Sequence, residues 1–428
     1  MSKALSFAEW SRLFRKINLF GLDFETAKCE IITMKRHIEC WIKEHFAECR
    51  QMLFVSGPRQ VGKTTSAKSA LKNAVYLNWD IADDRQLLLA GQNAVAEKLG
   101  VSDNPAIIID EFHKYPEWKN YLKGLFDALE SEHVKILITG SARLDTYRKG
   151  ADSLMGRYFI QHIHPLSVAE IIRPRCIDTL TTEQAKITPE NFNNLLVYGG
   201  FPEPFTSQTK RFHTRWKNVR QKQLFREELR DLFNVHEIGQ IEVLAELLRM
   251  QNGQLCNYAS LARKVRASEN SIRRWISILE SLYFCYSLKP WSKNISRSLC
   301  KEPKIYLWDW SVDANIGSRN ENFIASHLFK AVHAWNDAGH GDFGLYFLRT
   351  KDKREVDFIV THDNQPWFMV EAKTSDTVIS KHLKYFHERL DCKHAFQVVI
   401  KKEFENVDSF SFSRPIAISA LNFLSQLV

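Results

Sequence analysis

The first half of the chain alternates short apolar runs with longer amphipathic segments. The runs have the length of buried strands, and the segments that separate them have the spacing of helices. We predict five strands here, at residues 53–56, 74–78, 106–109, 134–139 and 157–162. Because strands that alternate with helices form a parallel sheet, residues 35–185 are predicted as an α/β domain. Residues 1–34 precede it as a predicted helical extension.

The middle of the chain has a helical pattern. Residues 186–240 have helical spacing around one rigid turn, Tyr-Gly-Gly-Phe-Pro-Glu-Pro at residues 198–204, and we predict a helical lid. Helical spacing resumes after residue 240, and Ser268 is of a type that caps helices. The spacing of three helices, at residues 241–250, 258–265 and 271–282, predicts a winged-helix domain over residues 241–300.

The last third of the chain returns to alternating strands and helices. Helices are predicted at residues 321–334 and 379–390, between strands at residues 304–308, 345–348, 356–360, 367–370 and 395–399. Residues 301–428 therefore form a second predicted α/β domain. A chain of 428 residues is long enough for two or three such domains.

Composition limits the cellular location and the partners that we expect for the protein. Its apolar runs are shorter than the roughly 18 residues of a membrane-spanning helix, and charged residues interrupt the N-terminus where a signal peptide needs its apolar core. The eight cysteines are scattered without a Cys-x-x-Cys pair, which favours neither a disulfide framework nor a zinc site. We therefore expect a cytoplasmic protein with no membrane partner. The net charge of +9 is compatible with a nucleic-acid partner.

The strongest local signal follows the first predicted strand. Residues 57–65 read Gly-Pro-Arg-Gln-Val-Gly-Lys-Thr-Thr, a Walker A pattern with four residues between its glycines. Successive backbone N–H groups of such a loop wrap a phosphate, and the following helix presents its positive end to the same anion. Lys63 would reach the β- and γ-phosphates of ATP, and the Thr64 hydroxyl would hold Mg²⁺. The predicted nucleotide-binding residues are Gly57, Pro58, Arg59, Gln60, Val61, Gly62, Lys63, Thr64 and Thr65.

The third predicted strand ends in two acids, Asp110 and Glu111. Asp110 would bind Mg²⁺, and Glu111 would orient and deprotonate the attacking water. Ser141, after the next strand, would sense the γ-phosphate, although Ser and Thr at strand ends are usually turn formers. Arg157 and Arg143 are rival candidates for an arginine finger, and either is equally well explained as a surface ion pair. A finger that acts on a neighbouring subunit would require a homo-oligomer.

Two basic stretches are candidates for nucleic-acid contact. The helix predicted after the Gly-Gly turn carries eight cations and only two acids, and it is either a solvated face or a track for phosphates. Its cations are Lys210, Arg211, Arg215, Lys217, Arg220, Lys222, Arg226 and Arg230. Arg273 and Arg274 lie near the start of the last winged-helix helix, where groove contacts are usually made. Such folds also serve as protein-contact modules, so both interpretations stay open.

A second set of candidate catalytic residues lies in the C-terminal domain. Asp357 would lie beside Glu371 and Lys373 if its strand pairs with theirs across a turn at residues 363–364. Two carboxylates that hold Mg²⁺ beside a lysine are what phosphodiester hydrolysis needs. Glu321 would be an additional acid on the metal. The alternative is a structural ion pair between Glu371 and Lys373.

Several of these stretches together resemble a family of prokaryotic AAA-type ATPases with an uncharacterised C-terminal domain of the restriction-endonuclease-like type. They are residues 57–64, 109–111, 139–141, 154–157, 198–202 and 371–373. The resemblance implies an AAA-type ATPase core, a winged-helix segment and a PD-(D/E)XK-like fold, which Asp357, Glu371 and Lys373 match. Residues 307–312 depart from it, because Leu-Trp-Asp-Trp-Ser-Val replaces a hydrophobic-Asp-Thr-Gly stretch. The first 34 residues have no counterpart in the family.

We therefore expect an ATP-hydrolysing, Mg²⁺-dependent AAA-type protein that couples nucleotide turnover to a nuclease-like domain. That domain would cut or bind nucleic acid, DNA rather than RNA. The alternative is a nucleotide-dependent switch that holds or releases a protein partner, with an inactive nuclease-like domain.

Overall fold

The computed structural model describes residues 34–100, 105–129, 134–140, 154–175, 178–225, 229, 237–292 and 302–428. Residues Lys35–Val428 form one compact unit. Nearly all of the predicted N-terminal extension lies outside the described residues, and so do Ser141, Arg143, Arg226 and Arg230.

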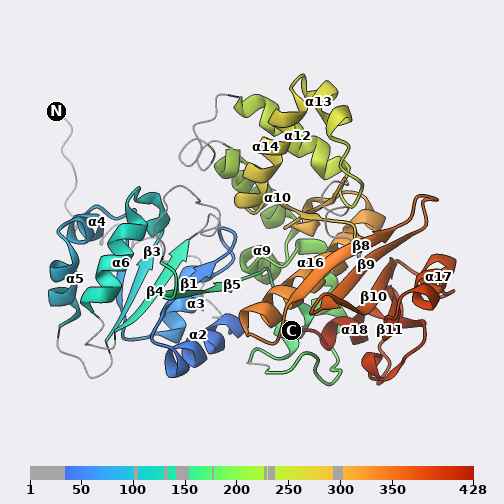
Figure 1. Cartoon of the computed structure of the whole chain (residues 1–428), viewed down its shortest axis with the longest axis horizontal. Coiled ribbons are helices and arrows are strands. Elements are labelled where there is room, and N and C mark those ends of the chain that lie inside the picture. The colour runs from blue at the N-terminus through green and yellow to red at the C-terminus, as the bar shows by residue number, and fades with distance from the viewer. Residues whose placement is uncertain are drawn as a thin grey trace, which may run out of the picture. The chain divides into compact units, whose positions relative to one another are not determined.

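The first sheet has five strands, all parallel, and confirms the predicted α/β domain (Figure 1). The last residues of neighbouring strands lie side by side. Asp110 pairs with Thr139, and Ser56 pairs with both Gly140 and His162. The strand order is β2 (Val75–Asn78), β3 (Ala106–Asp110), β4 (Lys135–Gly140), β1 (Met52–Ser56) and β5 (Tyr158–His162). The carboxyl ends of the strands therefore form one edge, where α/β proteins bind ligands.

Helices cover both faces of this sheet. Alternate strand residues such as Phe54, Ile107 and Ile138 point to one face and pack against α4 (Ala82–Leu89), α5 (Gln92–Leu99) and α6 (Trp118–Ala128). On the opposite face α3 (Lys63–Ala70) lies against β3 and β4, and α2 (His37–Glu48) packs on α3. After Asp110 the chain makes the short helix η1 (Phe112–Lys114), and after β5 it makes α7 (Val168–Ile172).

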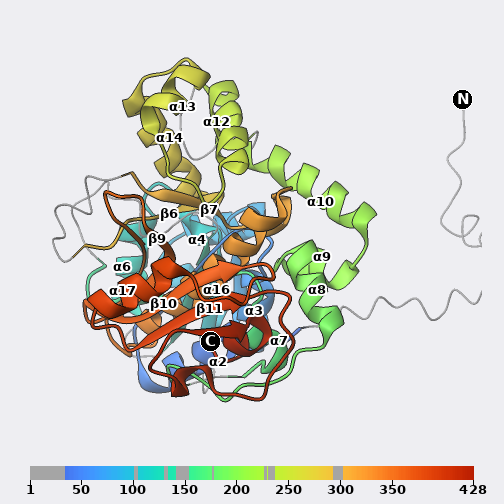
Figure 2. The same ribbon diagram turned by 90° about the vertical axis from the view of Figure 1, so that its right-hand side faces the viewer.

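The middle of the chain is helical, as expected. It contains α8 (Pro189–Tyr198), α9 (Pro202–Ser207), α10 (Lys210–Gln223), α12 (Ile238–Met250), α13 (Tyr258–Val265) and α14 (Glu269–Ser281). The Ser268 hydroxyl accepts a hydrogen bond from the Ser271 N–H and caps α14, which confirms that prediction. Figures 1 and 2 show α12, α13 and α14 side by side, and Figure 2 shows β6 and β7 beneath them.

One predicted strand belongs to a different sheet from the one we expected. Strand β7 (Lys304–Leu307) pairs antiparallel with β6 (Cys285–Leu288), which the sequence analysis missed, and it does not join the C-terminal sheet. The Asn322 side chain holds β7 from the other side, since its amide bonds both the N–H and the carbonyl of Leu307. The short helix η4 (Trp310–Val312) follows.

The C-terminal sheet is mixed. Strands β8, β9 and β10 are antiparallel, whereas β10, β11 and β12 are parallel. Helix α17 (Lys381–Arg389) packs on one face, and α16 (Ile316–Asp337) and α18 (Ala420–Ser425) contact the strands as well. The strands are β8 (Phe343–Arg349), β9 (Glu355–His362), β10 (Gln365–Lys373), β11 (His394–Val399) and β12 (Ile416–Ser419). Strand β12 and helix α18 were not predicted from the sequence, and α16 begins five residues before its predicted start at residue 321.

Two smaller observations bear on the composition arguments. None of the helices that the structure describes is both long and apolar enough to cross a bilayer. Cys40 is disulfide-bonded, although the scattered spacing of the cysteines argued against a disulfide framework. Four other described cysteines are free, namely Cys49, Cys256, Cys285 and Cys392.

Candidate functional site

The Walker A residues form the loop between β1 and α3. Gly62 adopts a φ of 102° and precedes the first residue of α3, so this position needs a glycine. A Cβ atom at Gly57 would lie 2.3 Å from the carbonyl oxygen of Ile163, which only a glycine avoids. The loop therefore follows β1 closely and leaves its N–H groups at the start of a helix, the arrangement that cradles phosphate.

Lys63 is held inside this loop. Its ammonium donates hydrogen bonds to the carbonyl oxygens of Gly57 (2.9 Å) and Pro58 (2.8 Å), and the residue is buried. Both acceptors are main-chain groups of the loop itself, so the charge already lies where the phosphates of a nucleotide would enter.

The Asp110 carboxylate collects three hydroxyl groups from three elements. It accepts hydrogen bonds from Thr64 at 2.6 Å and from Tyr76 at 2.9 Å. Thr139, at the end of β4, donates to its other oxygen. Asp110 and Thr64 are thus direct neighbours, as a shared Mg²⁺ requires, and their oxygens are the ligand type that Mg²⁺ prefers. The sequence pattern did not single out Tyr76.

Glu111 lies next to the same site. Its backbone is left-handed (φ 56°), and its N–H donates to the Thr139 carbonyl, which turns the side chain out of the strand direction. One carboxylate oxygen lies 3.7 Å from His113 and 3.6 Å from Lys114. Burial lowers the pKa of His113 to about 4, so the ring beside Glu111 is neutral at pH 7.

These residues line one open cavity of about 380 Å³. Its lining consists of Arg59, Gln60, Gly62, Lys63, Thr64, Thr65, Asp80, Asp110 and Glu111. The other three predicted nucleotide-binding residues, Gly57, Pro58 and Val61, are not part of this lining, and the carbonyl oxygens of Gly57 and Pro58 accept hydrogen bonds from Lys63. The structure thus brings the two acids and the Walker A loop to one pocket, at the carboxyl edge of the sheet.

Arg157 does not reach this pocket. It precedes β5, whose first residue pairs with Met52 at the start of β1, so it lies at the sheet edge opposite the Walker A loop. Its guanidinium forms an ion pair with Asp127 at 2.9 Å. The surface ion-pair interpretation therefore fits this chain, and a finger role would need a second subunit.

The C-terminal candidates lie on adjacent strands. β9 and β10 form an antiparallel hairpin around Asp363 and Asn364, both left-handed, so the predicted turn is confirmed. Asp357 accepts a hydrogen bond from the Ala372 N–H at 2.9 Å, which places it beside Glu371. Lys373 donates to Glu371 at 2.7 Å, on the face that the two share.

Glu321, on α16, lies near Asp357, and it contacts Tyr306 and Lys304 of β7. The carboxylates of Glu321, Glu355, Asp357 and Glu371 are called the acidic cluster below. The Tyr306 hydroxyl donates to Glu321 at 2.6 Å. The Lys304 ammonium lies 2.7 Å from Glu355, 3.3 Å from Glu321 and 3.8 Å from Asp357. Lys304 is only 3% exposed, so its charge is buried among three carboxylates. The sequence analysis missed both residues, although their spacing of two on a strand placed them on one face.

Burial and like charge perturb these carboxyl groups. Burial, and then the charge of Asp357, raises the pKa of Glu321 and that of Glu371 to about 7. Burial alone would lower the pKa of Lys304, but Glu321, Asp357 and Glu355 outweigh it and raise that pKa. Lys304 therefore stays charged, and it is a buried cation that the cluster already contains in addition to Lys373 on Glu371.

The fit of a metal ion differs between the two sites. Thr64 and Asp110 suit Mg²⁺, as described above. In the C-terminal cluster one buried oxygen of Glu371 has no hydrogen-bond partner, so one ligand position is available. However, in the described part of the chain no three Asp, Glu, His or Cys side chains converge closely enough to hold a metal ion. Asp357 and Glu371 form a pair, and Glu321 is engaged by Lys304 and Tyr306.

The basic stretches divide into exposed and inward-facing residues. On α10 Lys210, Arg211, Arg215 and Lys222 are exposed. Arg220 turns inward, where its guanidinium lies over the Phe201 ring at 3.9 Å and 3.5 Å from Asp309. On α14 Arg273 and Arg274 are exposed, and Arg273 stacks on Tyr258 at 3.7 Å.

Family comparisons divide the chain into three parts. Residues 49–172 match the family described as AAA domain. Residues 189–318 match a domain of unknown function, DUF8612, and residues 317–420 match another, DUF4143. The chain thus carries an AAA-type P-loop ATPase domain followed by two domains whose function is unknown.

Two bacterial relatives match most of the chain, and each is described as an uncharacterized protein. One from Mycobacterium tuberculosis is 24% identical over 356 residues, which are 78% of this chain and 73% of the relative. One from Haemophilus influenzae is 21% identical over 367 residues, which are 78% of this chain and 87% of the relative. Among solved structures, the Walker-type ATPase of Pyrococcus abyssi is 14% identical with a TM-score of 0.42, and the match covers 64% of this chain and 94% of that one.

Proposed function

We propose that this protein binds ATP with Mg²⁺ at residues 57–65 and hydrolyses it. The observation that carries the proposal is the 2.6 Å hydrogen bond between Thr64 and Asp110. It joins the Walker A hydroxyl to the strand-end carboxylate, and Lys63 and Glu111 line the same pocket. Bound Mg²⁺ would neutralise charge on the β- and γ-phosphates.

Lys63, Glu111 and the two further hydroxyl donors to Asp110 then have defined tasks. Lys63 exchanges its loop carbonyls for phosphate oxygens and offsets charge in the transition state. Glu111 accepts a proton from the attacking water, while neutral His113 and the Lys114 ammonium lie on its far side. Thr139 and Tyr76 hold Asp110 in orientation through their hydroxyl groups.

Two variants test this assignment. Lys63→Ala should abolish ATP hydrolysis, because it removes the charge that faces the transferred phosphoryl group. Glu111→Gln should keep ATP binding and lose hydrolysis by about 100-fold or more, since it removes the base and preserves the shape. Lys72 is exposed and lies beyond the C-terminal end of α3, so Lys72→Ala is the control and should hydrolyse ATP at the wild-type rate. Hydrolysis by Lys63→Ala at that rate would refute the proposal.

We further propose that the C-terminal domain is PD-(D/E)XK-like and engages nucleic acid. The order α16, β8, β9, β10, α17, β11 supports this, as do Asp357, Glu371 and Lys373 on its central hairpin. The order of three helices followed by the antiparallel β6–β7 pair supports a winged helix, with Arg273 and Arg274 exposed on α14. The test is cleavage of labelled DNA and RNA with ATP and Mn²⁺. Wild type should cut, and Asp357→Ala and Glu371→Ala should not.

A specific observation favours a second function, a nucleotide-dependent switch that binds without cutting. Lys304 already neutralises the acidic cluster from within, and a buried ammonium competes with a divalent cation for the same carboxylates. The switch interpretation expects nucleic-acid or protein binding that responds to ATP, with no cleavage by wild type. Binding to nucleic acid should weaken steeply with salt, and charge removal at Arg273 and Arg274 should flatten that dependence.

A further inference from the structure

Residues 162–168, which begin with the last residue of β5, lie between α16 and the phosphate loop, the name used below for residues 57–65. On the loop side, the Gly57 position leaves no room for a Cβ atom against Ile163. On the other side, α16 contacts the segment along its length. Asp337 accepts from the His162 N–H at 2.7 Å, and His327 accepts from the Val168 N–H at 3.1 Å. The segment therefore contacts the nucleotide loop and the C-terminal domain at once.

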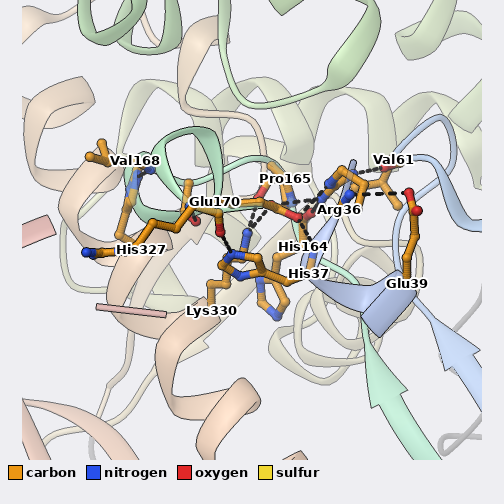
Figure 3. Close-up of polar contacts among 12 residues, drawn as sticks. Arg36, His37, Glu39, Val61, His164, Pro165, Val168, Glu170, His327 and Lys330 are labelled. Carbon is orange, nitrogen blue, oxygen red and sulfur yellow. Dashed lines mark hydrogen bonds and ion pairs between the residues drawn. The ribbon is translucent and has the colours of Figure 1, made fainter. Parts of the chain in front are cut away.

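Arg36 contacts the back of the phosphate loop. Its guanidinium donates to the carbonyl of Val61 at 2.6 Å and to the carbonyl of His164 at 2.7 Å. The Nε–H donates to Glu170 at 2.8 Å (Figure 3). Arg36 is only 5% exposed and lies before the part of the chain that matches the AAA domain.

Holding the Val61 carbonyl orients the next N–H group. A peptide unit is planar and trans, so the Gly62 N–H points opposite to the Val61 carbonyl. Gly62 lines the nucleotide pocket, and a Cβ atom at this position would lie 3.4 Å from the Arg36 guanidinium. Arg36 thus sets the direction of an N–H group on the phosphate side without touching the nucleotide.

Glu170 joins Arg36 to α16. Its carboxylate accepts from Arg36, from the His37 N–H at 2.9 Å and from the Lys330 ammonium at 2.5 Å. Lys330 also donates to the Pro165 carbonyl at 3.3 Å. Figure 3 shows Arg36 and Lys330 on opposite sides of the Glu170 carboxylate. Burial alone would raise the pKa of Glu170, but the charges of Arg36 and Lys330 outweigh it and hold that pKa well below its usual range.

These three charges are constrained to move together. Glu170 is 2% exposed and Lys330 is 6% exposed, and separating buried opposite charges leaves each without compensation. Lys330 lies nine residues after Glu321 on the same helix, a rise of about 14 Å. Asn322, beside Glu321, holds β7 and hence the strand of Lys304. A continuous set of contacts therefore runs from the Val61 carbonyl to the acidic cluster.

We propose that Arg36 is a positioning residue of the phosphate loop and that Glu170 and Lys330 make its position depend on α16. Nucleotide binding and the packing of α16 are then coupled in both directions, as linkage requires. The inference rests on the proposed binding of ATP at residues 57–65, and it assigns the route by which that site regulates the C-terminal domain.

The first test measures the affinity for the non-hydrolysable ATP analogue AMP-PNP with Mg²⁺. Arg36→Met should weaken binding about tenfold or more, the loss of a charge-assisted hydrogen bond, and Arg36→Lys should weaken it less. Lys330→Met should weaken binding several-fold although Lys330 is absent from the pocket lining. The double variant should bind no more weakly than Arg36→Met alone, because both changes act through one contact set. The exposed Lys381→Met is the control and should bind as wild type does.

The second test compares hydrogen exchange in wild type and in Lys330→Met. Hydrogen exchange of wild type should slow in α16 when AMP-PNP binds, whereas α17, on the same sheet, should not change. Lys330→Met should lose the effect on α16. If wild type binds no nucleotide, the proposed function fails. If it binds and α16 exchanges at an unchanged rate, or if Lys330→Met binds as tightly as wild type, the coupling is refuted while the ATP site stands.

Discussion

The hydroxyl groups of Ser56 and Tyr283 lie 2.7 Å apart. Ser56 ends β1 immediately before Gly57, and Tyr283 follows α14 in the middle part of the chain. Tyr283 is buried and has a φ of 56°, a conformation that a residue with a side chain adopts at some cost. The phosphate loop is therefore contacted at its start by Tyr283 and near its end by Arg36.

Removal of the Tyr283 hydroxyl should loosen the start of this loop. Tyr283→Phe leaves the buried Ser56 hydroxyl without this partner, so we expect a loss of about 1–3 kcal/mol in the free energy of unfolding. We also expect AMP-PNP to bind more weakly, by about tenfold or less. Urea unfolding and nucleotide titration measure the two effects.

Tyr286→Phe is the matched control for that change. Its hydroxyl is buried as well, but it lies 3.4 Å from Ser326 and has no contact with the loop. We expect this variant to keep the nucleotide affinity of wild type. An equal loss of affinity in both variants would mean that Tyr283 has no specific connection to the loop.

Thr139 should matter through its hydroxyl group. Thr139→Val keeps the shape of the side chain but removes the donor to Asp110, so the carboxylate loses one of its three hydroxyl partners. We expect the rate of ATP hydrolysis to fall by about tenfold, in proportion to one hydrogen bond to a charged group. Thr139→Ser retains the donor and should stay within about twofold of wild type. Steady-state hydrolysis at saturating Mg²⁺ distinguishes the two, and equal rates would refute the role.

Lys304 should determine how the C-terminal cluster responds to divalent cations. Lys304→Met leaves Glu321, Glu355 and Asp357 without their shared buried cation, so we expect a loss of about 3 kcal/mol in EDTA. Mn²⁺ should restore stability to this variant and have a smaller effect on wild type. Thermal unfolding with and without Mn²⁺ measures this, with the exposed Lys351→Met as control. The same Mn²⁺ response in all three proteins would contradict the prediction.

The ion pairs of Glu170 with Arg36 and Lys330 should make the free energy of unfolding fall in acid. Because the folded-state pKa of Glu170 lies below the unfolded value of about 4.3, the folded state binds fewer protons between them. The stabilisation is therefore present above about pH 4.3 and is lost as pH falls toward the folded pKa. The stabilisation amounts to about 1.4 kcal/mol for each unit by which the pKa of Glu170 differs between the folded and unfolded states.

Glu170→Gln isolates this contribution. At pH 7 the variant should be less stable than wild type by about 3–5 kcal/mol, because Arg36 and Lys330 lose their common counter-charge. That difference should narrow as pH falls from 5 to 3, because Glu170 becomes protonated in the unfolded chain while it stays ionised in the folded state. Urea unfolding at pH 7, 5 and 3 gives the three values. A difference that does not change with pH would show that Glu170 contributes through packing alone.

Local patterns were sufficient for the nucleotide site and the hairpin. Residues 57–65 are contiguous, so spacing alone places their backbone around a phosphate. Asp110 reaches Thr64 because parallel strands end at one edge, a rule that needs only the strand boundaries. Glu371 and Lys373 share a face through the period of two, and the turn at Asp363 and Asn364 brings Asp357 beside them.

Only the tertiary structure decided which charges are buried and what each one contacts. Glu170 meets Arg36 across 134 positions and Lys330 across 160, and nothing in the sequence distinguishes these residues from surface charges. Lys304 was assigned to the wrong sheet because pairing between distant strands depends on packing, and its contact with three carboxylates followed from that pairing. Periodicity reports which face of an element is apolar, but the partner of a buried charge depends on elements that meet only after the chain has folded.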